Sequence, residues 1–404
     1  MSQEQDHTLL LQAAVLPRES ALDAWREWSA QYQPSDIEDF AVSRIFPLVY
    51  KRLHVDGVKD GVKDRHTPIL KMAYQRAWYK NQMLFAEAER LLLLLEKHGI
   101  RTLLLKGLHL TLSYYGQPGV RPMGDVDVMV HRSDLEQAIH LLEEIGWQAK
   151  DPIPHKGAAA AFESHLCNDH ALSLYNSKGQ SVDLHWNLLH EWTHEDSNNT
   201  FWDNAVDVSF NRVQMLGLQP ADLLFHIMVH AKHEFTITAS QWYWAVDAMT
   251  VLQKTGTTTD WTRIIELAKE RCVLSRVKTA CRFLSEVCAA PIEPSVLESI
   301  EKTKLPRAER MELYYGERGD SGPLGGLPAR WAKFRRRYPE DSKSPLAFLH
   351  YMKTIWNVDR SWKLLFVLPT KLLTVSSRWI LSKLRPRRER AEEAAGVRQQ
   401  DARS

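Results

Sequence analysis

The sequence predicts an α+β fold in which a core that contains strands lies between N-terminal and C-terminal helical regions. Two patterns carry this prediction. Apolar residues recur at three- and four-residue spacing before residue 98 and again from about residue 221. Between these regions lie short apolar runs and alternating segments, separated by turn residues. The length of 404 residues suggests roughly two to three structural units, and 44% hydrophobic with 25% charged residues is typical of a globular protein.

Residues 1–98 are the predicted N-terminal helical region. Apolar residues at helical spacing indicate four helices, over residues 9–15, 20–31, 37–53 and 70–98. Gly99 follows the last of them, and glycine readily takes the left-handed conformation that ends a helix. The apolar run over residues 100–105 is short enough to be a buried strand.

Residues 99–212 are the predicted core. Lys106 and Gly107 lead into a helical pattern, which the glycine and proline residues of 116–119 interrupt. Over residues 125–130, carboxylates and valines alternate with the period of two that indicates a strand. The other expected core elements are a helix over residues 134–145 and a hairpin over residues 171–175 and 181–186.

The chain beyond the core divides by composition. Helical spacing predicts a helical domain over residues 213–315, and glycine and proline clusters mark residues 316–330 as a linker. Residues 331–390 form a basic tail rich in aromatic residues. We expect residues 391–404 to be disordered.

The formal charge of +2 conceals an uneven distribution of charge. Residues 330–390 contain 16 Lys and Arg but only 4 Asp and Glu, so the rest of the chain is acidic. Basic and aromatic residues together suit docking on the acidic body, an anionic membrane surface or nucleic acid, and all three remain open. The apolar run at residues 362–368 is far too short to span a membrane.

The N-terminus and the cysteines bear on the compartment. The N-terminus lacks the basic start and long apolar run of a signal peptide. The four cysteines show no close pair, which favours a reducing compartment without a zinc site. We therefore expect a cytoplasmic protein, with peripheral attachment to a membrane as one of the roles open to the tail.

The alternating strand carries the strongest chemical signal. Asp125 and Asp127 lie two apart, so both point to the same face of the strand, close enough to share metal ions. Asp183, in the second arm of the predicted hairpin, is placed to add a third carboxylate from an adjacent strand. The alternative is a surface strand edge or a turn, because Asp-x-Asp is a common pattern.

The segments LLLKGLHLTLSYYGQPGVRPMGDVDVMVHRSDLEQAIHLLEEIGW and VDLHWNLL resemble an uncharacterised bacterial nucleotidyltransferase-like family of the polymerase-beta nucleotidyltransferase superfamily. The resemblance reaches from about residue 8 to about residue 290 and includes QWYWAVDAMTVL. It implies a mixed-sheet nucleotidyltransferase core between the two helical regions. It also implies that Asp125, Asp127 and Asp183 are an acidic triad that binds the catalytic metal.

The resemblance places the Lys106–Gly107 turn at the position of the superfamily's glycine signature. Leu108 follows where the wider pattern has serine or glycine, so Lys106 is expected to contact the triphosphate instead. The alternative for Lys106 is a turn lysine that faces solvent. Arg121 is a second candidate for nucleotide binding, with a structural salt bridge as the equal alternative. His185, His190, His226 and His230 are interpreted as core or capping residues, and Asp247 as a buried partner of a cation.

These residues predict a nucleotidyltransferase that uses Mg²⁺ or Mn²⁺ and moves a nucleoside monophosphate from a nucleoside triphosphate to a hydroxyl. The acceptor is left open among a small molecule, a protein and an RNA. The alternative is an inactive protein of the same fold that serves as a binding or membrane-surface adaptor.

Overall fold

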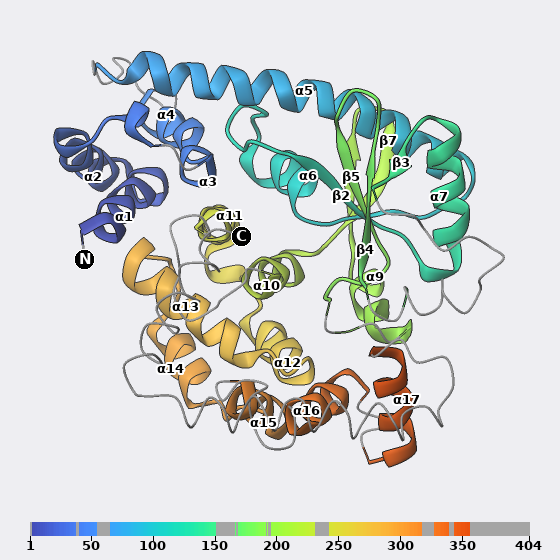
Figure 1. Cartoon of the computed structure of the whole chain (residues 1–404). Helices are drawn as coiled ribbons and strands as arrows, with labels where there is room; N and C mark the ends of the chain where they lie inside the picture. Colours follow the sequence, from blue (N-terminus) through green and yellow to red (C-terminus); the bar gives the residue numbers. More distant parts are fainter. Residues whose placement is uncertain are drawn as a thin grey trace, which may run out of the picture. The chain divides into compact units, whose positions relative to one another are not determined.

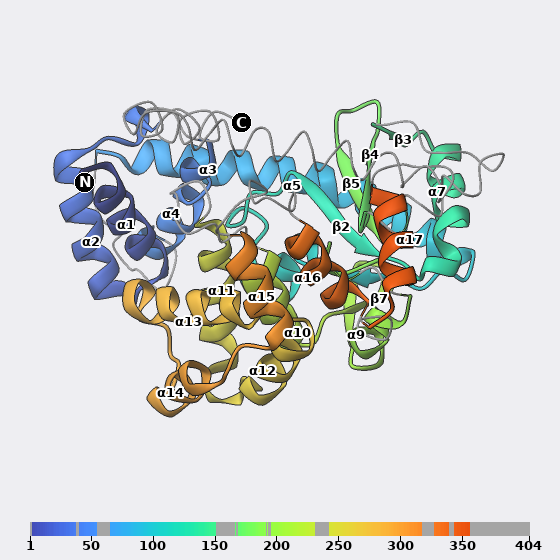
Figure 2. The same ribbon diagram turned by 60° about the horizontal axis from the view of Figure 1, so that its bottom comes forward.

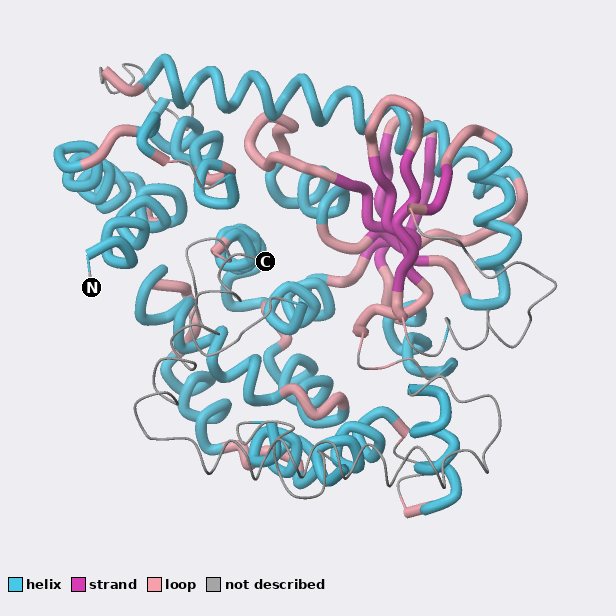
Figure 3. Tube along the Cα trace, in the orientation of Figure 1, coloured by secondary structure: helices cyan, strands magenta, loops and turns pink. Residues whose placement is uncertain are grey.

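The computed structural model describes residues 2–37, 40–54, 65–150, 166, 169–190, 192, 195–230, 242–316, 327–338 and 343–355. The chain forms two compact units, Met1–Lys304 and Leu305–Ser404. The first contains a mixed sheet with helices around it, shown in magenta and cyan in Figure 3. The described residues of the second unit form helices. The predicted α+β class with a mixed sheet is confirmed.

The helix α5 (Thr67–Lys97) connects the N-terminal helices to the sheet, as Figures 1 and 2 show from two sides. The helices before it are α1 (Ser2–Val15), α2 (Arg18–Gln31), α3 (Phe40–Ser43) and α4 (Phe46–His54). The predicted long helix is thus confirmed, and the expected helix over residues 37–53 is divided into α3 and α4. Gly99 has a φ of +76°, the left-handed conformation expected after α5.

The sheet has seven strands in the order β3-β4-β5-β2-β1-β7-β6. Their bounds are β1 (Leu103–Leu104), β2 (Asp125–Met129), β3 (Gln148–Ala149), β4 (Ala171–Tyr175), β5 (Ser181–His185), β6 (Val206–Phe210) and β7 (Val213–Gly217). The predicted β2 and the predicted hairpin of β4 and β5 are confirmed. The central strand β2 is parallel to β5 and antiparallel to β1.

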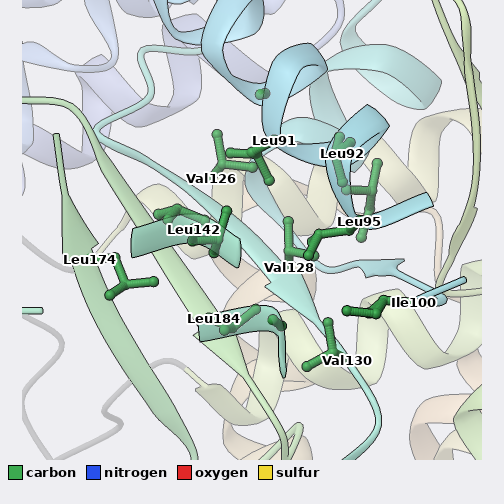
Figure 4. Packing of buried hydrophobic residues seen from close by; sticks show 14 of the residues in the cluster. Leu91, Leu92, Leu95, Ile100, Val126, Val128, Val130, Leu142, Leu174 and Leu184 are labelled. Carbon is green, nitrogen blue, oxygen red and sulfur yellow. The ribbon is translucent and has the colours of Figure 1, made fainter. Parts of the chain in front are cut away.

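One face of β2 is covered by α5 and by α7 (Leu135–Glu144). Val126 and Val128 pack against leucines of both helices, among them Leu91, Leu95 and Leu142 (Figure 4). All five side chains are buried, which stabilises the sheet on the helices. Because side chains alternate along a strand, Asp125 and Asp127 project from the opposite face.

The sheet extends beyond residue 212, which was the predicted end of the core. β6 and β7 form an antiparallel hairpin whose turn contains Asn211 with a φ of +52°. Gly217, at the end of β7, permits a close approach of His109, since a Cβ there would lie 2.7 Å from the His109 ring atom Cε1. The alternation of Val206, Val208 and Phe210 is a signal from which this hairpin could have been predicted.

The expected helical region after the sheet is confirmed, and its described residues in the first unit include five α-helices. They are α10 (Pro220–His230), α11 (Tyr243–Thr255), α12 (Trp261–Glu270), α13 (Leu274–Cys288) and α14 (Pro294–Lys302). A fully buried carboxylate, Asp222, joins α10 to α12 by accepting hydrogen bonds of 2.6 and 2.8 Å from Arg263. The short described helical elements between β1 and β6 are α6 (Gly107–Leu110), the π-helical turn η2 (Thr111–Tyr115), η3 (Arg132–Asp134), η5 (Glu195–Asn198) and α9 (Asn199–Asp203).

The second unit contains part of the basic tail. Its described helices are α15 (Arg307–Gly316), α16 (Leu327–Arg337) and α17 (Pro345–Ile355). Aromatic rings of α16 and α17 pack against one another, among them Trp331, Phe334, Phe348 and Tyr351. These four rings therefore pack within the unit, and the three roles considered for the tail stay predictions. Most of the expected linker, the run at residues 362–368 and residues 391–404 lie outside the described residues.

Across the described part of the chain, no helix has both the length and the apolar character needed to cross a membrane.

Candidate active site

The parallel pairing of β2 and β5 brings the predicted carboxylates together. Asp127 and Asp183 are direct partners in the register, so their side chains leave the sheet on the same face. Asp125, two residues before Asp127, shares that face. The three acidic residues thus share one face of the sheet, opposite α5 and α7. Asp127 and Asp183 belong to a group whose ligand atoms lie within 4.8 Å of one another, and Asp125 lies outside this group.

His185 is a further possible metal ligand beside Asp127 and Asp183, and it is not among the predicted site residues. Ligand atoms of Asp127, Asp183 and His185 all lie within 4.8 Å of one another. The Ser173 hydroxyl on β4 donates a 2.6 Å hydrogen bond to Asp183 Oδ1, which fixes the orientation of this carboxylate. Two carboxylates and an imidazole in this arrangement are a donor set that fits a divalent cation.

Asp127 is the most enclosed of the three carboxylates, with 4% of its surface exposed. Its Oδ1 lies 3.4 Å from Lys106 Nζ and 3.4 Å from His185 Nε2. Burial by itself raises the pKa of Asp127. The charge of Lys106 and the interaction with His185 outweigh burial, so the pKa lies well below its usual range. Asp127 is therefore ionised at neutral pH.

Asp125 has the opposite shift. Burial and the nearby charges of Asp127 and Asp183 raise its pKa to about 6. Without a metal ion, this carboxylate therefore holds its proton to a higher pH than an exposed aspartate. A bound cation would offset the repulsion among the three acids.

Asp125→Asn is expected to raise the melting temperature of the metal-free protein at pH 8. The ionised Asp125 destabilises the fold above a pKa of about 6, and the amide removes this charge. This destabilisation of the wild-type fold should disappear as the pH falls from about 6 towards 3.8, the pKa of the aspartate in the unfolded chain. The melting temperatures of wild type and variant should therefore converge at low pH. The effect at pH 8 is about 1–3 kcal/mol.

Thermal unfolding in EDTA at pH 8 and pH 5 measures this difference. The control is Asp207→Asn, which changes an exposed aspartate on β6 of the same sheet and should shift neither curve. If Asp125→Asn melts below wild type at pH 8, repulsion between ionised Asp125 and its acidic neighbours does not destabilise the metal-free fold.

Histidines from three segments gather beside the acidic residues. The ring of His170 lies 5.3 Å from the rings of both His185 and His190, and 6.5 Å from that of His230 at the end of α10. His230 Nε2 lies 3.1 Å from Lys106 Nζ. Burial and the neighbouring charged groups lower the pKa of His170 to about 3, which keeps its ring neutral.

The interpretation of these histidines needs one correction. His226 is fully buried, as a core residue would be. His185 and His230, by contrast, contact the groups on the acidic face, and the core-or-capping interpretation misses this contact. The alternation from Asp183 to His185 along β5 was a usable signal for the first of them.

Arg121, four residues before Asp125, forms a buried ion pair with Asp247. Its Nε and Nη2 donate hydrogen bonds of 2.9 and 2.8 Å to the two carboxylate oxygens of Asp247 on α11. Tyr115 donates a further bond of 2.7 Å to Asp247 Oδ1. The expectation that Asp247 is a buried partner of a cation is confirmed. The structural salt bridge considered for Arg121 is present, with Asp247 as the acid.

Gly107 is buried at the start of α6, directly after Lys106. A Cβ at this position would lie 3.3 Å from Met123 Cε and 3.6 Å from the backbone oxygen of Asp125. The absence of a side chain therefore lets the Lys106–Gly107 turn approach the first residue of β2 closely. Lys106, with 23% of its side chain exposed, connects this turn to the acidic face.

A mixed sheet that presents neighbouring carboxylates beside a lysine is a candidate enzyme site for a substrate that carries phosphate. Residues 40–288 match the sequence model of a family described as uncharacterised nucleotidyltransferase. The chain belongs to this family. The match ends close to residue 290, where the predicted resemblance ended.

The crystal structure of an antigenic nucleotidyltransferase-like protein from Paracoccidioides brasiliensis is similar at 13% identity and a TM-score of 0.33. The similarity covers 54% of this chain and 95% of the other. No curated protein matches the sequence.

Proposed function

We propose that this protein is a divalent-metal nucleotidyltransferase of the polymerase-beta superfamily, moving a nucleoside monophosphate from a nucleoside triphosphate to a hydroxyl. One observation carries the proposal. Asp127 and Asp183 are register partners on parallel strands, and their ligand atoms lie within 4.8 Å of each other and of His185. Membership of a nucleotidyltransferase family supports the same activity.

The reaction joins the acceptor oxygen to the α-phosphorus and breaks the bond from that phosphorus to the departing pyrophosphate. The proton of the attacking hydroxyl passes to a carboxylate, for which we propose Asp183. A divalent ion of the Mg²⁺ or Mn²⁺ class, held by Asp125, Asp127 and Asp183, would neutralise the triphosphate. The location of the three residues on one face of the sheet supports both proposed roles.

Lys106 and Gly107 are proposed to bind the nucleotide. The Lys106 ammonium is partly exposed at the edge of the acidic face, so a triphosphate next to Asp127 can reach it. Gly107 is proposed to contribute through the position of its backbone, because the absence of a side chain lets the turn that carries Lys106 lie against the first residue of β2. For Arg121, the nucleotide-binding role stays a prediction, and the buried pair with Asp247 supports a positioning role for the start of β2.

Lys106→Ala is expected to weaken triphosphate binding by about tenfold or more, since a charge-assisted bond to phosphate contributes about 1.5–3 kcal/mol. The fold should persist because the lysine is partly exposed. Isothermal titration with a non-hydrolysable triphosphate measures the affinity. Lys97→Ala, at the exposed end of α5, is the matched control. Equal affinities of both variants and wild type would remove Lys106 from the nucleotide site.

Incubation with each labelled nucleoside triphosphate, Mg²⁺ or Mn²⁺ and a cell lysate tests the proposed activity. α-Labelled donor should transfer its label to an acceptor, whereas γ-labelled donor should release labelled pyrophosphate. Digestion with protease or ribonuclease then assigns the acceptor to protein, RNA or a small molecule. Binding of triphosphate without transfer under any of these conditions would favour the inactive adaptor instead.

A further inference from the structure

Asp183 is followed two residues later on β5 by a nitrogen donor. Side chains two apart on a strand share a face, so His185 stands on the acidic face. Its side chain is 2% exposed, and its Nε2 lies 3.4 Å from Asp127 Oδ1. Its Nδ1 has no hydrogen-bond partner among the described residues. The His185 ring is therefore buried beside the Asp127 carboxylate, and no hydrogen bond from its Nδ1 to another described residue holds it in a different orientation.

We propose that His185 is a direct metal ligand through Nε2, and that the site therefore selects a transition-metal ion of the Mn²⁺ class over Mg²⁺. The inference rests on the metal-dependent transfer proposed above. Mg²⁺ prefers oxygen ligands and gives up its water reluctantly. Imidazole nitrogen favours first-row transition ions. The nitrogen of His185, added to the carboxylates already proposed as ligands, shifts the preference towards these ions.

The three donors are close enough to converge on one ion. Ligand atoms about 2.1 Å from a six-coordinate ion lie about 3.0 Å apart when they are adjacent and about 4.2 Å apart when they are opposite. Asp127 Oδ1 and His185 Nε2 lie 3.4 Å apart, and all three donors lie within 4.8 Å of one another, so binding one ion requires side-chain shifts on the order of 1 Å. Two neighbours already orient them: Ser173 holds Asp183 by its hydrogen bond, and the ring of His170 packs edge-on against His185. A hydrogen bond such as the one from Ser173 is typical of a carboxylate that binds a metal ion.

Pulsed electron paramagnetic resonance of the full chain with Mn²⁺ alone tests the ligand without nucleotide and without turnover. The wild-type protein should show nitrogen coupling from one imidazole to the bound Mn²⁺, and labelling histidine with ¹⁵N should change the coupling pattern. His185→Gln should abolish the coupling and weaken Mn²⁺ binding by about tenfold or more. Binding of Mg²⁺, measured by competition, should change by less than about threefold, since glutamine offers an oxygen ligand.

Three other histidine variants identify the source of the nitrogen. His140→Gln changes an exposed histidine on α7, and His170→Gln and His230→Gln remove rings near the site but outside the proposed ligand set. All three should keep the coupling. The proposal is overturned if wild type binds no Mn²⁺, if bound Mn²⁺ shows no nitrogen coupling, or if the coupling survives in His185→Gln. Coupling in a protein that transfers no nucleotide would retain the metal ligand and reject the proposed function.

Discussion

Asp127→Asn should reduce nucleotidyl transfer by about 10³-fold or more. The carboxylate is opposite Asp183 in the sheet, and both Lys106 and His185 lie 3.4 Å from its Oδ1. Removing its charge therefore affects the metal ligands and the lysine at once. Metal ions contribute several kcal/mol to the stabilisation of the transition state, and about 4 kcal/mol corresponds to about 10³-fold in rate.

The measurement is the rate of label transfer at saturating metal and triphosphate, with Asp207→Asn as the control. Asp207 also lies on a strand of the sheet, but it is exposed on the edge strand β6. A comparison with Asp183→Asn separates the roles of the two acids. If Asp183 takes the proton from the acceptor, its variant should retain much of the triphosphate binding while losing transfer. Transfer within tenfold of wild type by Asp127→Asn would exclude the proposed site.

Local patterns in the sequence were sufficient for the strand that carries the acids. The alternation from Asp125 to Val130 placed both carboxylates on one face, and the turn residues between the arms of the hairpin placed Asp183 on a strand. Both inferences depend on residues that are close together in the sequence. Alternation with a period of two reveals such local features.

The pairing of β2 with β5 could be suggested but not established from the sequence, because the two strands are far apart in the chain. The alternation of β2 is the same whichever strand lies beside it, so the Asp127–Asp183 register needed the structure. His230 reaches Lys106 from the end of α10, a helix whose spacing is that of any core helix. Asp247 meets Arg121 in the same way, from α11. Continuing the alternation past Asp183, however, would have placed His185 at the site.

Asp247→Ala should lower the free energy of unfolding by about 3–5 kcal/mol, the range for breaking one side of a buried ion pair. Arg121 is 6% exposed and directs two hydrogen bonds to Asp247, so the alanine variant leaves a guanidinium without its counter-charge. Tyr115 loses its acceptor as well. Urea denaturation at neutral pH measures the loss. Asp260→Ala, an exposed helix cap on α12, is the control and should cost about 1 kcal/mol.

A double variant, Arg121→Met with Asp247→Leu, distinguishes the two roles considered for Arg121. Replacing both charges by apolar side chains of similar size removes the unpaired guanidinium, so it should recover most of the stability lost in Asp247→Ala. Stability that stays at the level of the single variant would show that the pair does more than neutralise buried charge. With the fold restored, triphosphate affinity equal to that of wild type would mean that Arg121 only positions the start of β2. A loss of about tenfold or more would show that its guanidinium also binds the phosphates, because such a bond contributes about 1.5–3 kcal/mol.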